Sequence, residues 1–365
     1  MRQKLNSVLA AVLTVTCFYV LFTIIALGLH DWNPLWFMWL GERYANLDPA
    51  GRTGYDGQFV YYIARDGMAA IPHLDNAPWR LQRILLPLVT RVLSLGQPDA
   101  MPWMLILINL AAICTSTFAL AQWLHSQKVS AWYSLTYSLF VGLLLAYSRN
   151  LTEPLAFCLA AWGVTTWLKK KHVPAIFLLA LAALTRETAV LFAVGLALAQ
   201  LAHKNLRLAF IASTAALPLL VWEGYLFARF SVVPFRVGPT MELIPLAGSL
   251  PYLSLDPARL SAFALVGVPS ALWAIFSAMH LLKNPHLDPA WLLLTVSVFM
   301  TLMPPVLYEH IMGAGRIAAG LVLAALFMFP TLSEPARKAV LIYWVAPILL
   351  WLIPILRWAP WLSKI

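Results

Sequence analysis

Long apolar runs recur along the whole chain of 365 residues, and short polar segments separate them. Only 11% of the residues are charged, whereas soluble domains carry about 25%. This composition excludes a water-soluble globular protein, and the 61% of hydrophobic residues excludes a disordered chain. The three cysteines lie inside apolar runs, which excludes a disulfide-rich scaffold. We therefore expect an all-α, polytopic transmembrane bundle that forms one integral membrane domain over residues 1–365.

The apolar runs predict about eleven spans, within a range of nine to twelve, because a crossing helix needs about 20 apolar residues. The first run is about 23 residues long, and the apolar core of a signal peptide has only about 7–15. We therefore expect a retained first span. The expected spans are residues 7–29, 101–123, 131–147, 151–168, 173–185, 188–202, 208–227, 261–282, 289–307, 314–331 and 339–356.

Lysines and arginines fall on opposite sides of the membrane if the N-terminus lies inside. The inner lysines, which follow the positive-inside rule, are Lys4, Lys128, Lys169, Lys170, Lys171, Lys204, Lys283 and Lys338. The arginines expected outside are Arg43, Arg52, Arg65, Arg80, Arg83, Arg91, Arg149, Arg186, Arg229, Arg236, Arg259, Arg316 and Arg357. Because the positive-inside rule does not account for them, these arginines need another explanation.

Two explanations for the outer arginines remain open. They can pair with the outer acids in an ion-pair network that braces the loops. They can instead line an outer cavity that binds an anion, because the planar guanidinium matches two carboxylate or phosphate oxygens at once. We favour the cavity for the set as a whole. The net charge of +10 does not indicate a nucleic-acid partner, because the cations are scattered between apolar segments.

Residues 30–100 form the first outer loop, which faces the periplasm or its equivalent. Its sequence predicts two amphipathic helices, over residues 56–69 and 79–95. In the second, apolar residues such as Leu85, Leu88 and Val92 lie opposite Arg80 and Arg83. This spacing indicates a helix that lies at the membrane surface.

A polar break interrupts the apolar stretch 173–202 at Arg186 and Glu187. Either one long helix buries the pair, or two short helices meet in a loop below the outer surface. Irregular backbone at that depth is tolerated only where it lines a cavity or is covered by protein. Ionisable residues there indicate a functional site, and a structural pair that ties helices together is the alternative.

Two further outer segments carry polar residues. Glu153 begins a span just after Thr152, where it can stabilise the helix N-terminus or take part in a site. Tyr308 and His310 lie in a short loop that precedes Arg316. A histidine in such a loop is either solvated or part of the site.

Residues 54–64, which read GYDGQFVYYIA, and residues 79–87, which read WRLQRILLP, resemble the first outer loop of the GT-C superfamily of membrane glycosyltransferases. Residues 184–188, which read LTRET, resemble a short loop between the middle spans of those enzymes. The resemblance implies a polyprenyl-phosphate-sugar donor and transfer to an acceptor on the outer face. It also implies that Asp56 is the catalytic base, with Asp31 as the alternative.

The chemistry of the residues agrees with that expectation. A carboxylate can accept the proton of an acceptor hydroxyl, and fixed positive charge can stabilise the leaving phosphate. We therefore expect an inverting glycosyltransferase in the bacterial inner membrane. We expect no cofactor. The sequence leaves open whether a divalent metal is required, which sugar is transferred, and whether the acceptor is a glycan, a lipid or a protein. A carrier or flippase for an anionic substrate is the alternative. The expected substrate-binding residues are Arg186, Glu187, Arg80, Arg83, Gln58, Tyr62, Arg149, Glu153, Tyr308, His310 and Arg316.

Overall fold

The computed structural model describes residues 2–252, 257–309 and 311–357, and within these ranges the chain forms helices and turns without a β-strand. The expected all-α class is therefore confirmed. His310 lies outside the described residues. Five described helices are long and apolar enough to cross a membrane, namely Asn6–Leu29, Met101–Ser126, Leu206–Phe230, Arg259–Lys283 and Glu334–Arg357. The count of about eleven spans is not confirmed and stays a prediction.

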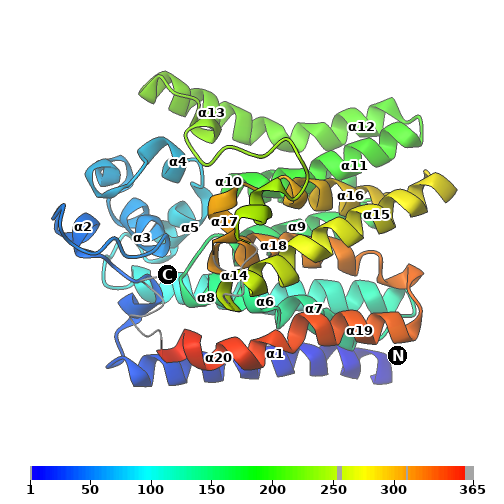
Figure 1. Ribbon diagram of the computed structural model, residues 1–365, viewed down its shortest axis with the longest axis horizontal. Helices are drawn as coiled ribbons and strands as arrows, with labels where there is room; N and C mark the ends of the chain where they lie inside the picture. Colours follow the sequence, from blue (N-terminus) through cyan, green and yellow to red (C-terminus); the bar gives the residue numbers. More distant parts are fainter. Residues whose placement is uncertain (1, 253–256, 310, 358–365) are drawn as a thin grey trace.

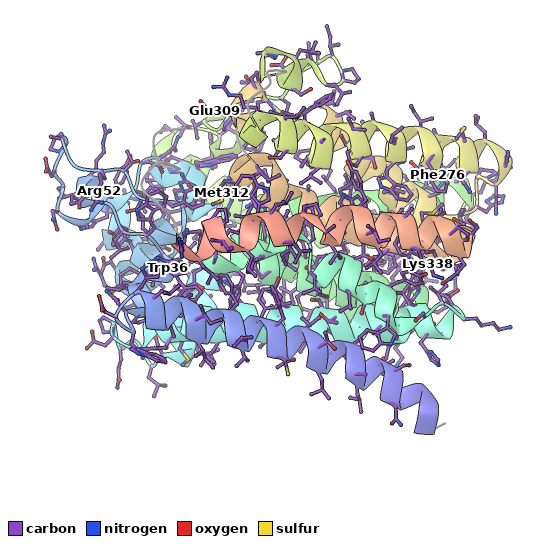
Figure 2. All side chains as sticks on the ribbon, turned by 60° about the horizontal axis from the view of Figure 1, so that its bottom comes forward. Trp36, Arg52, Phe276, Glu309, Met312 and Lys338 are labelled. Atoms are coloured by element: carbon purple, nitrogen blue, oxygen red, sulfur yellow. The ribbon has the colours of Figure 1, made fainter. Side chains whose placement is uncertain are left out.

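The principal helices lie side by side along one direction (Figure 1). In chain order they are α1 (Arg2–Leu29), α6 (Met101–Ser126), α9 (Glu153–Leu168), α10 (His172–Thr185), α11 (Val190–Ala202), α12 (Leu206–Ser213), α13 (Leu217–Phe230), α15 (Val268–Lys283), α16 (Asp288–Thr301), α18 (Ile311–Leu326), α19 (Glu334–Val345) and α20 (Pro347–Arg357). The first-loop helices α2 (Glu42–Ala45), α3 (Gly57–Asp66) and α4 (Ala77–Leu81) gather at one end of this bundle. Figure 2 shows Arg52 at that end and Lys338 toward the opposite end.

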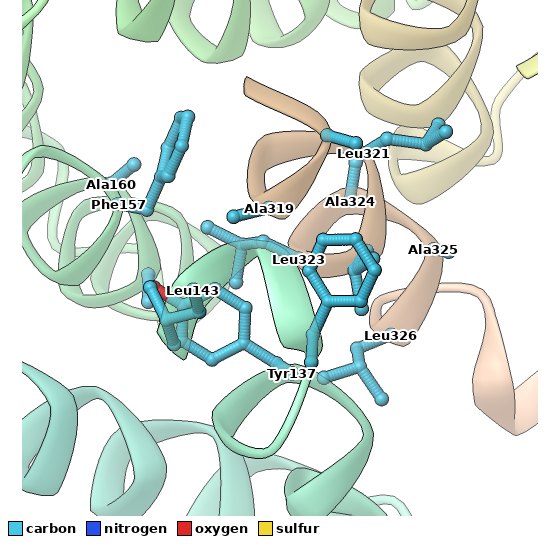
Figure 3. Close-up of a cluster of buried hydrophobic side chains, with 14 of the residues drawn as sticks. Tyr137, Leu143, Phe157, Ala160, Ala319, Leu321, Leu323, Ala324, Ala325 and Leu326 are labelled. Atoms are coloured by element: carbon cyan, nitrogen blue, oxygen red, sulfur yellow. The ribbon is translucent and has the colours of Figure 1, made fainter. Parts of the chain in front are cut away.

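Helix α18 is the centre of the bundle, since all of its residues are buried. Its leucine and alanine side chains pack against α9, α7 (Leu135–Ser138) and α8 (Val141–Ser148) (Figure 3). Helix α8 comes so close that a Cβ on Gly142 would lie 2.0 Å from the Gly315 carbonyl oxygen. Glycine at position 142 therefore allows the approach that holds α18, and with it Arg316, in place.

The expected span 131–147 is divided into a 3₁₀ turn (Ala131–Ser134), α7 and α8. Phe140 has extended backbone angles directly before α8, so the helical hydrogen-bond ladder is interrupted there. The segment contains no charged residue and no proline, which is why the sequence shows no such break.

The first outer loop contains the expected first helix as α3, followed by a 3₁₀ turn (Gly67–His73). A single helix over 79–95 is wrong, because α4 ends at Leu81 and α5 spans Leu85–Leu93. In a continuous helix the ring of Pro87 would clash with the carbonyl of the residue four positions earlier. Since α5 begins two residues before Pro87, the proline lies in its first turn, where it is tolerated.

Helix α5 buries one polar side chain and exposes part of its apolar surface. Thr90 is buried and donates to the Leu86 carbonyl at 2.8 Å, so its hydroxyl needs no water. By contrast, Leu88 and Val92 are 50% and 62% exposed. Leu86 is buried in the core, so only part of the apolar surface of this helix points away from the bundle.

The break between α10 and α11 resolves the two alternatives for residues 173–202. Arg186 has extended backbone angles, and a short 3₁₀ turn (Glu187–Ala189) follows before α11 begins. One continuous helix is therefore wrong, and two short helices meet at Arg186.

Candidate functional site

Asp56 lies at the N-cap position of α3, but its side chain makes no capping hydrogen bond. Its carboxylate instead lies between two arginines. Arg80 Nη2 of α4 is 2.9 Å from Oδ1, and Arg316 Nη2 of α18 is 2.6 Å from Oδ2. Helix capping therefore does not explain Asp56, because its carboxylate pairs with two arginines that are distant in the sequence.

The two arginines determine the ionisation of Asp56. Burial by itself would raise the pKa of this carboxyl, but the charges of Arg80 and Arg316 and their hydrogen bonds lower the pKa well below its usual value. Asp56 is therefore an anion at neutral pH, and it is a weak base as long as both arginines hold it.

Glu153 is a second carboxylate that pairs with two arginines. It is fully buried at the start of α9, and its Oε1 lies 3.0 Å from Arg186 Nη1 and 3.5 Å from Arg316 Nε. Thr152, at the N-cap, makes no side-chain capping hydrogen bond. Arg316 therefore links Glu153 to Asp56, and Glu153 does more than stabilise its own helix end.

Arg186 and Glu187 are neighbours in the sequence but pair with different partners. Glu187 accepts two hydrogen bonds from Arg83, from Nε at 2.9 Å and from Nη2 at 2.8 Å, while Arg186 pairs with Glu153. The guanidinium of Arg83 also lies 4.9 Å from the Trp79 ring centroid. The polar break thus ties α9 and the first outer loop to the junction of α10 and α11.

Asp75 is an acid of this cluster that the sequence analysis did not single out. It accepts two hydrogen bonds from Arg80, from Nε at 2.7 Å and from Nη2 at 2.6 Å. The Arg80 guanidinium also lies 4.4 Å from the centroid of Phe59. In the sequence, Asp75 directly precedes Asn76, a residue type that often caps helices. The Asn76 side chain does cap α4, accepting a hydrogen bond from Trp79 N at 3.2 Å, and this cap is the sequence signal that could have drawn attention to Asp75.

The charged cluster consists of four arginines and four acids, so its formal charges cancel. Its members are Arg80, Arg83, Arg186, Arg316, Asp56, Asp75, Glu153 and Glu187. Four of the arginines expected outside thus form an ion-pair network at this place. The same network also lines a cavity, so the two explanations drawn from the sequence are not exclusive.

The cavity has a volume of about 540 Å³, with charged side chains along one part and apolar ones along another. Its charged lining contains all members of the cluster except Glu153. Its apolar walls include Phe299, Met303, Val306, Leu307, Phe235 and Met241. A second cavity of about 20 Å³, which has room for one water molecule, shares Asp56 and all four arginines with it. The arrangement suits a ligand with an anionic head and an apolar part.

The segment after α13 covers part of this cavity. Asn76 Nδ2 donates to the Val237 carbonyl at 3.2 Å, and Gly238 lies so close to the Trp79 ring that a Cβ would come within 2.4 Å of it. Farther along, Glu242 N donates to the Leu302 carbonyl at 2.9 Å. Residues 237–242 therefore run from α4 to the end of α16.

No protein family, curated protein or solved structure matches this chain. The interpretation of the site thus depends on its own geometry. Within the described residues, no group of three or more His, Cys, Asp or Glu side chains is placed to hold a metal ion.

Several residues expected at the site lie outside the cavity lining. Gln58 is buried and bridges the first outer loop, accepting from Gly41 N at 3.0 Å and donating to the Thr53 carbonyl at 2.6 Å. Tyr62 is buried, with its ring 5.4 Å from that of His73. These contacts hold the loop together, which is a structural role.

Arg149 is fully buried behind the site. Its guanidinium lies 4.5 Å from the centroid of Trp36, and its Nη1 donates to the Ser148 carbonyl at 2.7 Å. Tyr308 donates to the Met300 carbonyl at 3.1 Å. Asp31 lies exposed in the turn that follows α1, and it does not line the cavity.

Proposed function

We propose that this chain is a membrane glycosyltransferase of GT-C type that moves a sugar from a polyprenyl-phosphate donor to an acceptor. The observation that carries the proposal is the carboxylate of Asp56, which lines the cavity between Arg80 and Arg316 instead of capping its helix. A base beside fixed cations is the pair of groups that glycosyl transfer from a phosphate requires.

The proposed reaction is a single displacement. An acceptor hydroxyl oxygen forms a bond to the anomeric carbon while the bond between that carbon and the phosphate oxygen breaks. The bonding electron pair stays on the phosphate, whose added charge the arginines stabilise. The hydroxyl proton passes to a carboxylate oxygen of Asp56 and then to solvent. Direct displacement inverts the anomeric centre.

The phosphate has candidate donors in the cavity lining. Arg186 Nε and Thr188 Oγ1 are buried and have no hydrogen-bond partner among the described residues, and Arg316 Nε has its 3.5 Å ion-pair contact with Glu153 but no hydrogen bond. An unpaired buried donor costs about 1–3 kcal/mol, and a phosphate oxygen would satisfy it. Thr188, which the sequence analysis did not single out, follows Arg186 by two positions at the same helix junction.

The lipid part of the donor has apolar surface nearby. The apolar cavity walls continue from the arginines, and Leu88 and Val92 of α5 are exposed. We propose that about eleven spans cross the bacterial inner membrane and that the cavity faces the periplasm. Lys338, one of the inner lysines, and Arg52 of the first outer loop lie at opposite ends of the bundle in Figure 2, which supports this orientation.

The test is donor consumption by the purified protein in detergent. The protein would be supplied with a panel of polyprenyl-phosphate hexoses and pentoses together with a membrane-lipid extract as the acceptor source, and released polyprenyl phosphate would be measured. We expect release with at least one sugar, and none from Asp56→Asn. Binding of these lipids without release, together with their movement across vesicle membranes, would favour the carrier instead.

A further inference from the structure

Arg80 is the one arginine of the charged cluster whose guanidinium is divided between two aspartates of the first outer loop. Its Nε and Nη2 bind Asp75 in a two-pronged pair at 2.7 and 2.6 Å, and the same Nη2 lies 2.9 Å from Asp56. Phe59 packs against the guanidinium, and the Arg80 side chain is only 12% exposed. The geometry thus places Asp75 and Asp56 in competition for one cation.

Since all four arginines of the cluster are paired with acids, a phosphate takes up the charge of one of them most directly when that arginine exchanges partners. Arg186 and Glu153 are 2% and 0% exposed, so separating them would leave buried charges unpaired. Arg80 differs, because it can leave Asp56 and still keep its two-pronged pair with Asp75. An arriving phosphate therefore disturbs the Arg80–Asp56 contact at a lower cost than the Arg186–Glu153 pair.

We propose that Asp75 is a positioning residue that draws Arg80 partly away from Asp56, and so keeps Asp56 able to accept a proton while limiting the affinity for the donor phosphate. This inference rests on the proposed function. Asp75 acts through Arg80, and no contact between Asp75 and the reacting atoms is required.

The charge of Asp75 acts on Asp56 together with the other ionisable groups around it. These are Arg80 from α4, Arg316 from α18, Glu153 from α9, the neighbouring Tyr55, and Arg149 behind that ring. With the negative charge at position 75 removed, Arg80 pairs fully with Asp56 and the site gains one positive charge. The pKa of Asp56 then falls, and the phosphate is bound more tightly.

The test is Asp75→Asn, which keeps the size of the side chain and removes its charge. Binding of a radiolabelled polyprenyl phosphate to the purified protein in detergent would be measured first, because it does not depend on turnover. We expect affinity to rise severalfold. With the donor that the native protein consumes, kcat should fall about tenfold, and the acid limb of its pH profile should move to lower pH. Asp75→Glu should restore both.

Asp66→Asn is the matched control. Asp66 also forms a two-pronged pair, with Arg65, in the same loop and at similar exposure, 26% against 31% for Asp75. It does not line the cavity, so donor binding and the pH profile should stay as in the native protein.

The possible outcomes are distinguishable. Weaker polyprenyl phosphate binding by Asp75→Asn would show that Asp75 merely supports Arg80 and would overturn the inference. An unchanged affinity and pH profile would also overturn it, while the glycosyltransferase proposal would stand. A native protein that consumes no lipid-linked sugar would contradict the proposed function, whatever the binding measurements show.

Discussion

Arg316 in the central helix pairs with Asp56 in the first outer loop, with Nη2 of the arginine 2.6 Å from Oδ2 of the aspartate. The same guanidinium reaches Glu153, where Nε lies 3.5 Å from Oε1. Because α18 is buried along its whole length, Arg316 has a rigid support. This one side chain therefore connects the loop that carries the proposed base to the core of the bundle.

Replacement of Asp56 by asparagine tests the assignment of the base. Asparagine has the same shape but does not accept the proton, so we expect turnover to fall by roughly 10²–10⁴-fold while the protein still folds and binds the lipid donor. Asp31→Asn should cost much less, because Asp31 lies outside the cavity lining. Initial rates and donor affinities of the two variants decide whether Asp56 or Asp31 is the base. Near-normal turnover of Asp56→Asn, or a loss of turnover confined to Asp31→Asn, would show that Asp56 is not the base.

Replacement of Arg186 by lysine tests the phosphate site. Lysine keeps the charge but lacks the fork that lets Arg186 contact Glu153 and still keep a second donor, Nε, without a partner among the described residues. We expect donor turnover to fall by about 10²–10³-fold with normal membrane expression. Arg52→Lys is the control, since Arg52 is an exposed partner of Glu42. Native-like rates for Arg186→Lys would contradict its role at the phosphate.

The contact between α8 and α18 should be sensitive to a single methyl group. A Cβ on Gly142 would lie 2.0 Å from the Gly315 carbonyl oxygen, so Gly142→Ala forces the two backbones apart. We expect the free energy of unfolding to fall by about 1–3 kcal/mol, which is the usual loss of stability when a well-packed core is overfilled. Thermal unfolding of the purified protein in detergent measures this loss of stability. Gly224→Ala, where a Cβ meets no atom within 4 Å, should be neutral or stabilising; equal effects of both changes would show that packing is not the cause.

The orientation in the membrane is open to chemical labelling. In a cysteine-free background, single cysteines at Lys170 and Lys204 should be shielded from a membrane-impermeant thiol reagent added outside intact cells. A cysteine at Asp48, which is exposed in the first outer loop, should react, and so should one at Leu243, which is exposed in the segment after α13. Labelling of Lys170→Cys from outside would reverse the assignment of sides.

The helical class and the position of the polar break at Arg186 could be predicted from the sequence, because hydropathy and polar interruptions are local properties, whereas the single helix expected over 79–95 was wrong. The orientation of α5 could not be predicted. Its spacing shows that Leu88 and Thr90 lie on different sides of the helix, but the side that faces the bundle depends on neighbouring elements. The division of 131–147 was equally hidden, since the segment contains no charged residue and no proline.

The sequence by itself determined that the chain is helical and that Asp56, Arg80, Arg186 and Arg316 lie in or beside polar segments between apolar runs. Only the tertiary structure decided which charges meet. The pairing of Asp56 with Arg316 depends on how closely α18 packs against α8, and that distance is set by the absence of a side chain on Gly142. The sharing of Arg80 between Asp56 and Asp75 likewise depends on where α4 lies against α3. A pattern along the chain records the type of each residue, whereas an ion pair requires two side chains to meet in space.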